Sequence, residues 1–204
     1  SVAMVVMHGA GFLSVKIERG AVLDRARRIG SVAAVASLVL FAAGGLWVAN
    51  GVMGFRLEGV VDPNGPSNPL FVKTVAAPGA WMDNYGRHPW MLIAPILGLA
   101  GPVIALLGIR RHSHVLNLAG SSLATVGIIA TVGLSMFPFI LPSSIDPQSS
   151  LTAWNASSSH LTLWIMLIVT LIFLPLVLAY TAWVMKVLFG RISLRDVRTN
   201  PDFY

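Results

Sequence analysis

Four long stretches of this chain contain no charged residue, and they constrain its fold more than any other feature. They cover residues 30–54, 90–109, 115–141 and 161–185. Each reaches about the 20 residues that an α-helix needs to cross the roughly 30 Å hydrocarbon core of a membrane. Only 11% of the 204 residues are charged, compared with about 25% in an average soluble domain. The apolar stretches are therefore expected to face lipid or other membrane helices.

This pattern predicts an all-α, polytopic transmembrane helical bundle that forms a single membrane domain over residues 1–204. Four complete spans are predicted, at 29–55, 89–109, 115–141 and 161–189. A further apolar segment at 1–14 is too short to cross the membrane and starts as though already inside a helix. We interpret it as a partial span, and we expect the chain to be the C-terminal half of a longer polypeptide.

Basic residues gather on alternate connections between the spans. If the spans alternate in direction, eleven of the fourteen lie on one side of the membrane: Lys16, Arg19, Arg25, Arg27, Arg28, Arg110, Arg111, Lys186, Arg191, Arg195 and Arg198. Because cytoplasmic loops carry an excess of Lys and Arg, the C-terminus is predicted to be cytoplasmic. The net charge of +6 thus indicates membrane topology. The sequence has no basic stripe interleaved with aromatic residues, which is the pattern that would indicate nucleic-acid binding.

Histidine would be the usual axial ligand of a membrane haem, and the chain has five histidines. Four of them, His88, His112, His114 and His160, fall at span ends or in loops. Only His8 is expected within a span, where a hydrogen-bonded packing role is the more common one. The chain contains no cysteine, so it offers no thiolate ligand. We predict no catalytic residue, no cofactor-binding residue and no metal ligand in this chain.

A polar stripe of Asn117, Ser121 and Thr125 recurs every fourth residue along the predicted span at 115–141. It could form one wall of a water path, or it could hydrogen-bond to a neighbouring helix. We favour hydrogen bonding, because Ser, Thr and Asn commonly join membrane helices in this way. A proton path usually shows an ionisable residue at mid-depth, and the charge-free parts of the four complete spans contain none.

The loop before the last predicted span has the residue types of a hydrolase, namely Asp146, Ser157, Ser158, Ser159 and His160. They are crowded together without a nucleophile elbow or an oxyanion motif. Capping of the following helix explains the serines better, because hydroxyl groups accept hydrogen bonds from the free N–H groups of a first turn.

Several phrases of the sequence together carry a family resemblance. They are DPNGPSNPL at 62–70, GAWMDNY at 79–85, MFPFILPSS at 136–144, SLTAWNASSS at 150–159, YTAW at 180–183 and FGRI at 189–192. This set resembles subunit II of the cytochrome bd quinol oxidases, in the order that the family has. The resemblance covers essentially the whole chain. It matches the last half of a subunit with about nine spans, beginning inside the fifth.

The resemblance implies a non-haem membrane subunit of a respiratory terminal oxidase. In this family the haems b and haem d and the quinol-oxidising loop belong to subunit I. The complex oxidises ubiquinol or menaquinol and reduces dioxygen to water. Subunit II packs against subunit I, so this chain alone is expected to have no catalytic activity and to bind no cofactor. Its expected partners are subunit I, membrane lipid and a quinone. Its expected location is the bacterial inner (cytoplasmic) membrane, as a multi-pass protein.

The chain departs from the family pattern at Asn155, where an Asp is usual. A charge-dependent contact would be lost here, whereas a capping or hydrogen-bonding role would survive. We expect the motifs around Trp81 and Trp154 to serve packing and capping. Two other functions stay open from the residues alone: half of a secondary transporter, or a scaffold subunit of another membrane complex. A transporter would favour discontinuous helices and a polar site at mid-depth.

Overall fold

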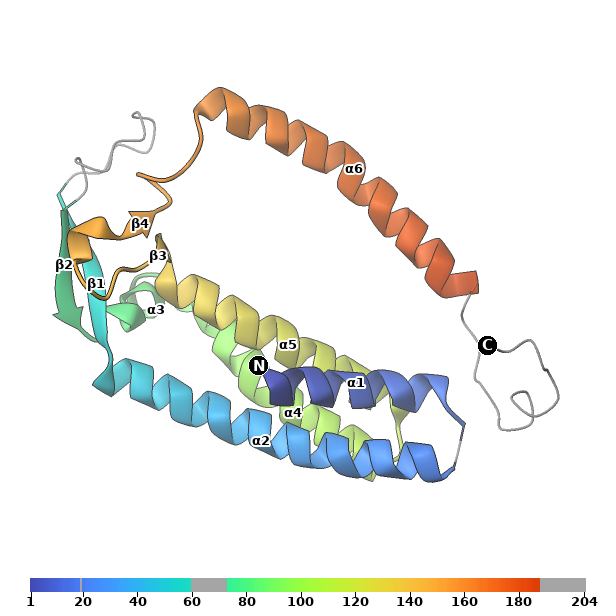
Figure 1. Cartoon of the computed structure of the whole chain (residues 1–204). Helices are drawn as coiled ribbons and strands as arrows, with labels where there is room; N and C mark the ends of the chain where they lie inside the picture. Colours follow the sequence, from blue (N-terminus) through green and yellow to red (C-terminus); the bar gives the residue numbers. More distant parts are fainter. Residues whose placement is uncertain (19, 60–72, 188–204) are drawn as a thin grey trace. The chain divides into compact units, whose positions relative to one another are not determined.

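The computed structural model describes residues 1–18, 20–59 and 73–187 (Figure 1). Some features of the sequence analysis lie outside these ranges: Arg19, the phrases at 62–70 and 189–192, the last two residues of the predicted span at 161–189, and Arg191, Arg195 and Arg198. The chain divides into two compact units, which are described separately.

The first unit is a bundle of antiparallel helices, drawn from Ser1–Trp47 and Asn84–Leu134 among the described residues. Its long helices are α1 (Val2–Lys16), most of α2 (Ala21–Gly51), α4 (Ile93–Arg110) and α5 (His114–Met136). Two short elements lead into α4, namely α3 (Asp83–Arg87) and the 3-10 helix η3 (Pro89–Leu92).

The second unit contains two short β-ribbons and one long helix, and comprises Val48–Asp83 and Ser135–Phe189 so far as these are described. Strand β1 (Met53–Glu58) pairs antiparallel with β2 (Lys73–Pro78), and β3 (Phe139–Leu141) pairs antiparallel with β4 (Leu151–Thr152). The 3-10 helices η2 (Ala80–Met82) and η4 (Pro147–Ser149) and the helix α6 (His160–Val187) complete it. No residue of α6 is buried within the chain.

The helical membrane fold is confirmed. Within the described residues, four helical segments are long and apolar enough to cross a membrane: Ala21–Gly51, Pro89–Arg110, His114–Met136 and His160–Val187. They correspond in order to the four predicted complete spans. The two β-ribbons are additional to the all-α prediction and connect the spans.

Helix α2 begins eight residues before the predicted span at 29–55. The stretch from Ala21 to Arg28 is helical although it is charged, because Leu23 and Ala26 on its inner face are buried in the bundle. Asp24 lies in the first turn, where the helix dipole favours an acidic residue. The helix also ends earlier than predicted, at Gly51, and the chain then enters β1.

Helix α5 ends at Met136, five residues before the end of the predicted span at 115–141. The physical reason is Pro138, because a proline disfavours helical backbone at the residue before it and cannot donate a backbone hydrogen bond. Phe139–Leu141 then pairs with β4 instead of extending the helix. Apolarity alone does not distinguish the two outcomes.

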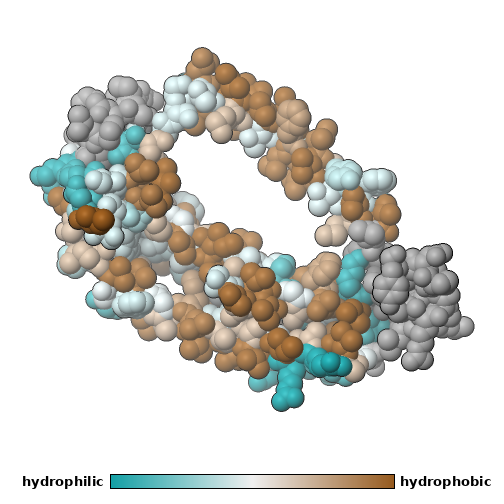
Figure 2. Space-filling view, viewed as in Figure 1, coloured by the Kyte–Doolittle hydropathy of each residue, from teal (hydrophilic) through white to brown (hydrophobic). Residues whose placement is uncertain are grey.

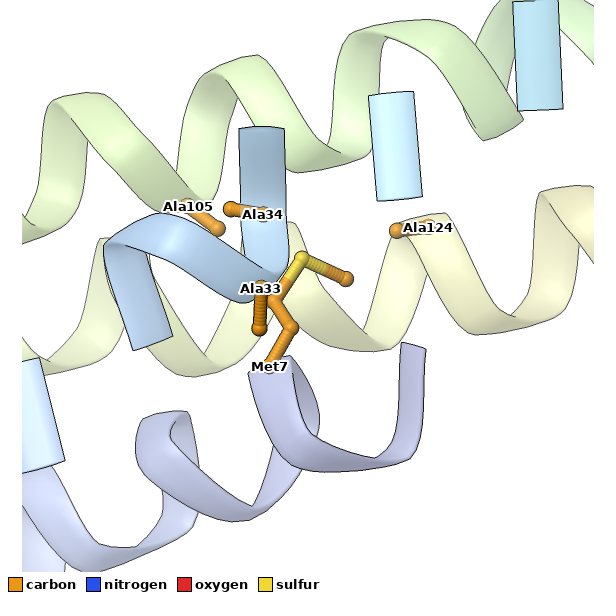
Figure 3. Packing of buried hydrophobic residues seen from close by; sticks show 5 residues of the cluster. All are labelled: Met7, Ala33, Ala34, Ala105 and Ala124. Carbon is orange, nitrogen blue, oxygen red and sulfur yellow. The ribbon is translucent and has the colours of Figure 1, made fainter. Parts of the chain in front are cut away.

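Small side chains let the four helices of the bundle approach closely. The buried cluster takes one or two residues from each helix: Met7 from α1, Ala33 and Ala34 from α2, Ala105 from α4 and Ala124 from α5 (Figure 3). Met7 is the single long side chain among them and is fully buried. Such small-residue interfaces are typical of membrane helices, where close packing replaces the hydrophobic effect as the driving force.

Helices α4 and α5 are in backbone contact along most of their length. A Cβ atom added to Gly101, Gly108, Gly120 or Gly127 would lie under 3.0 Å from backbone atoms of the facing helix. The contacts pair Gly98 with Gly127, Gly101 with Ala124, Gly120 with Ala105, and Gly108 with Asn117. The numbers of each pair add to the same value, so the register stays constant and the two helices are antiparallel.

Candidate functional site

The polar stripe of α5 is buried against α1. His8 Nδ1 lies 3.1 Å from Ser121 Oγ, and Ser121 Oγ donates to the Leu118 carbonyl at 2.9 Å. Because a hydroxyl group has one proton, this arrangement assigns the proton of the first contact to His8 Nδ1. His8 is thus hydrogen-bonded to a neighbouring helix, as the sequence predicts.

Asn117 makes the second contact between the same helices. Its Nδ2 donates to Ser14 Oγ at 3.3 Å, and Ser14 Oγ in turn donates to the Gly11 carbonyl at 2.7 Å. Asn117, Ser14 and Ser121 are all at most 2% exposed. Thr125, the third residue of the stripe, donates to the Ser121 carbonyl within α5. The prediction of interhelical hydrogen bonding is therefore confirmed for Asn117 and Ser121, whereas Thr125 bonds within its own helix.

The remaining histidines lie at helix ends. His88 precedes η3, His112 occupies a left-handed turn with a φ of 54° after α4, and His114 and His160 are the first residues of α5 and α6. Within residues 1–18, 20–59 and 73–187, no three His, Asp or Glu side chains come together as the ligands of a metal ion would.

An aromatic cluster organises the β-ribbons of the second unit. Trp81 from η2 meets Phe55 of β1 and Phe139 of β3, with ring centroids 5.7 and 5.8 Å apart and edge-to-face geometry. Its indole Nε1 also donates to the Met53 carbonyl. Trp81 is 7% exposed. The GAWMDNY phrase therefore places its Trp at the centre of the packing between the two ribbons, in agreement with the expected packing role.

Polar contacts join the same elements. Arg56 of β1 forms an ion pair with Asp83, 2.6 Å from Nη2 to Oδ2, and its Nε also donates to Oδ2. Gln148 of η4 exchanges two hydrogen bonds with the backbone of Thr74 in β2. Sequence reasoning missed these contacts and the place of Phe55. The isolated opposite charges of Arg56 and Asp83 were the available signal for the ion pair.

Asn155 uses both ends of its side-chain amide. Its Oδ1 accepts from the Thr152 backbone N–H at 2.6 Å and from Thr152 Oγ1 at 2.9 Å, while its Nδ2 donates to the Ser150 carbonyl at 3.2 Å. Thr152 and Ser150 are almost fully buried. The side chain that departs from the family pattern is thus the hydrogen-bonding centre of the turn after β4.

Two hydrogen bonds join helix α3 to the C-terminal part of α5. Asn84 Nδ2 donates to the Leu134 carbonyl at 2.9 Å, and the Tyr85 hydroxyl donates to the Thr131 carbonyl at 3.0 Å. Burial raises the pKa of Tyr85 from its ordinary value of 10.0. The hydroxyl therefore keeps its proton, and its hydrogen bond, at any physiological pH.

A cavity of about 640 Å³ opens between α1, α2 and α5. Its walls are apolar, with Phe41 and Ile129 among them, and no ionisable side chain lines it. Ser37 is 5% exposed and contributes a hydroxyl oxygen without a hydrogen-bond partner in the structure. This space suits an apolar chain.

These features define the class of the protein. It is a polytopic helical membrane protein, and its described polar groups join its own helices and ribbons to one another. The family model of cytochrome bd terminal oxidase subunit II matches residues 1–188. The chain belongs to the cytochrome bd terminal oxidase subunit II family.

Two curated relatives support this assignment. The chain is 38% identical over 200 residues to cytochrome bd-I ubiquinol oxidase subunit 2 of Escherichia coli K12. It is 32% identical over 200 residues to the probable cytochrome oxidase subunit 2 of Haemophilus influenzae. Both alignments cover 98% of this chain and 52% of the relative. The chain thus spans about half the length of the curated relatives it matches.

Proposed function

We propose that this chain acts as part of the non-haem membrane subunit of a cytochrome bd-type quinol oxidase. In this role it packs against a haem-bearing subunit I. It thereby supports the oxidation of quinol coupled to the reduction of dioxygen to water in the respiratory chain. The observation that carries the proposal is the family match over residues 1–188. The naming of the Escherichia coli relative as a ubiquinol oxidase subunit favours quinol as the substrate of the complex.

The chemistry of the described residues agrees with a supporting role. Among the histidines of the described helices, His8 alone lies away from a helix end, and its Nδ1 is engaged by Ser121. Asn117 and Ser14 are likewise used in helix contacts. On the family resemblance, we propose that haems b and d lie in the partner subunit and that this chain supplies no cofactor ligand and no catalytic residue.

The proposed location is the bacterial inner membrane, with the basic end of the bundle in the cytoplasm. Lys16 at the end of α1, Arg25 at the start of α2 and Arg110 at the end of α4 share that end, because α1 and α2 and then α4 and α5 are connected there. The positive-inside rule assigns such an end to the cytoplasm. Membrane lipid and a quinone are the further partners that we propose.

The test is purification of the native complex in mild detergent, with mass spectrometry of its subunits and a reduced-minus-oxidised spectrum. We expect a larger subunit to co-purify and the complex to show b- and d-type haem bands. The same chain expressed alone is the matched control and is expected to show no haem band.

Two outcomes would contradict the proposal. One is a native preparation in which this chain is colourless and has no haem-bearing partner. The other is haem absorbance in the chain expressed alone, because that would place a haem ligand within it. In the first case, solute uptake by the reconstituted protein would test the transporter function.

A further inference from the structure

The outward face of α2 changes from basic to apolar along a single stripe. Arg25 and Arg28 are exposed, and Val32, Val35 and Val39 follow them at spacings of three or four residues. The three valines are 68%, 49% and 58% exposed. Residues three and four apart lie on one face of a helix, so the five side chains form one continuous strip.

The bundle contacts of α2 lie on the other side of the helix. Its buried residues are Leu23, Ala26, Gly30, Ala33, Ala34 and Ser37. Their spacing defines one inner face, and the strip from Arg25 to Val39 occupies the outer one. No other described part of the first unit covers these side chains.

Helix α4 presents a similar strip next to α2. The added Cβ of Gly98 would meet the Phe41 ring, and that of Gly30 would meet Ile109, so the two helices run antiparallel side by side. Arg110 therefore lies at the same level as the first turns of α2. Arg110 is exposed, and Leu107 and Val103 before it are 43% and 42% exposed.

The arginines of these strips form no ion pair within the described structure. The two ion pairs found there are Arg56–Asp83 and Lys73–Glu58, both in the second unit. Among the described residues near this end, the acidic ones are Glu18 and Asp24, and the basic ones are Lys16, Arg25, Arg27, Arg28, Arg110 and Arg111. These described residues carry an excess of positive charge beside an apolar surface, and Figure 2 shows hydrophilic residues gathered there.

The dimensions of the strip match one leaflet of a bilayer. Val39 lies eleven positions after Arg28, and a helix rises about 1.5 Å per residue, which gives about 16 Å. Half of a hydrocarbon core is about 15 Å thick. An arginine at the headgroup level would therefore be followed by valines over the length of an acyl chain.

We propose that this face binds an anionic phospholipid, with Arg25 and Arg28 on its phosphate group and the valine strip of α2 along an acyl chain. The guanidinium group suits this role, because its fixed fork of donors can bind two phosphate oxygens at once. Charge complementarity favours an anionic lipid over a zwitterionic one. The proposal depends on the membrane fold and is independent of the oxidase function.

The experiment compares lipid binding to the purified complex by native mass spectrometry, with phosphatidylglycerol and phosphatidylcholine as probes. The test variant carries Arg25→Gln and Arg28→Gln. A basic residue near the membrane surface contributes roughly a fivefold gain in affinity. We expect the variant to bind phosphatidylglycerol about 25-fold more weakly and phosphatidylcholine as the wild type does.

Two variants serve as controls. Arg87→Gln makes the same charge change at an exposed residue of α3, at the other end of the bundle, and is expected to leave lipid binding unchanged. Arg25→Lys with Arg28→Lys keeps the charge and is expected to retain most of the preference for phosphatidylglycerol. The unfolding temperature of each variant is measured to confirm that the fold persists.

Equal binding of the two lipids by the wild type would overturn the proposal, as would unchanged phosphatidylglycerol binding by the glutamine variant. Loss of a co-purifying subunit without loss of lipid would also overturn it, because this face would then be a protein interface. The haem spectrum of the same sample reports separately on the proposed oxidase function.

Discussion

At the scale of single residues, the side chains that the sequence motifs point to make hydrogen bonds and ring contacts with residues close to them in the fold. Asn155 joins Thr152 to Ser150, Trp81 joins β1 to β3, and Asn117 joins α5 to α1. Each contact satisfies polar groups or fills space where the chain changes direction or where helices meet. These residues therefore contribute to the packing of the fold.

The substitution Asn155→Asp tests this at one position. The carboxylate would still accept from Thr152, but it would lose the Nδ2 donor to the Ser150 carbonyl and place an oxygen against it. A buried acceptor left without a partner costs about 1–3 kcal/mol. We expect the unfolding temperature in detergent to fall for Asn155→Asp and to fall further for Asn155→Ala. An unchanged unfolding temperature for the Asp variant would show that the bond to Ser150 adds no stability.

The sequence predicted that polar residues of α5 would form hydrogen bonds to another helix, but it did not predict which residues would be their partners. The i, i+4 spacing of Asn117 and Ser121 indicated that both would meet another helix, and both do. The partner His8 is 113 positions away in the sequence, and a single sequence contains no signal that connects the two. The ring contacts of Trp81 with Phe55 and Phe139 were unpredictable for the same reason.

At the scale of elements, helices α4 and α5 pack closely because the glycines at their contact carry no side chain. Gly101 and Gly120 face the backbones of Ala124 and Ala105, and Gly108 faces the backbone of Asn117. Small residues allow membrane helices to approach closely. Their presence in a single sequence does not show that α5 is the partner of α4.

We predict that Gly101→Ala and Gly120→Ala each destabilise the protein. The new methyl group would come closer to the facing backbone than real Cβ atoms do, so the helices must separate. Overpacking of this kind costs about 1–3 kcal/mol. Thermal unfolding in detergent, followed by circular dichroism, measures the loss.

The matched control is Gly133→Ala, also on α5, where an added Cβ would meet nothing within 4 Å. It is expected to be neutral or slightly stabilising, because alanine has the higher helix propensity. If all three variants unfold at the same temperature, the close α4–α5 contact does not contribute to stability.

At the scale of the whole chain, the positions of the spans followed from the sequence, whereas the connections between them did not. Charge-free stretches located four helices, since ionised side chains are costly in lipid. The residues around Pro138 were assigned to a helix on apolarity alone and form a strand. Strand β1 pairs with β2 across a long connection, and the two strands carry no periodicity strong enough to predict the pair.

The distribution of burial within the bundle predicts which of its side chains carry stability. Met7 is fully buried in the bundle, whereas Val126 of α5, in the same unit, is 60% exposed. We expect Met7→Ala to cost about 2–5 kcal/mol, as buried truncations do. We expect Val126→Ala to change the unfolding free energy by at most about 0.5 kcal/mol. Unfolding of the purified chain in detergent measures both, and equal losses would mean that burial within the bundle does not decide the cost.

The constant register of α4 and α5 restricts how this protein can move. Sliding one helix along the other by a single residue would bring a side chain onto a backbone atom where a glycine now lies. Rotation of either helix about its own axis meets the same obstacle. Piston and screw motions between these two helices are therefore blocked, so the pair must travel as one body. Any rearrangement within this helical unit has to take place at other helix contacts.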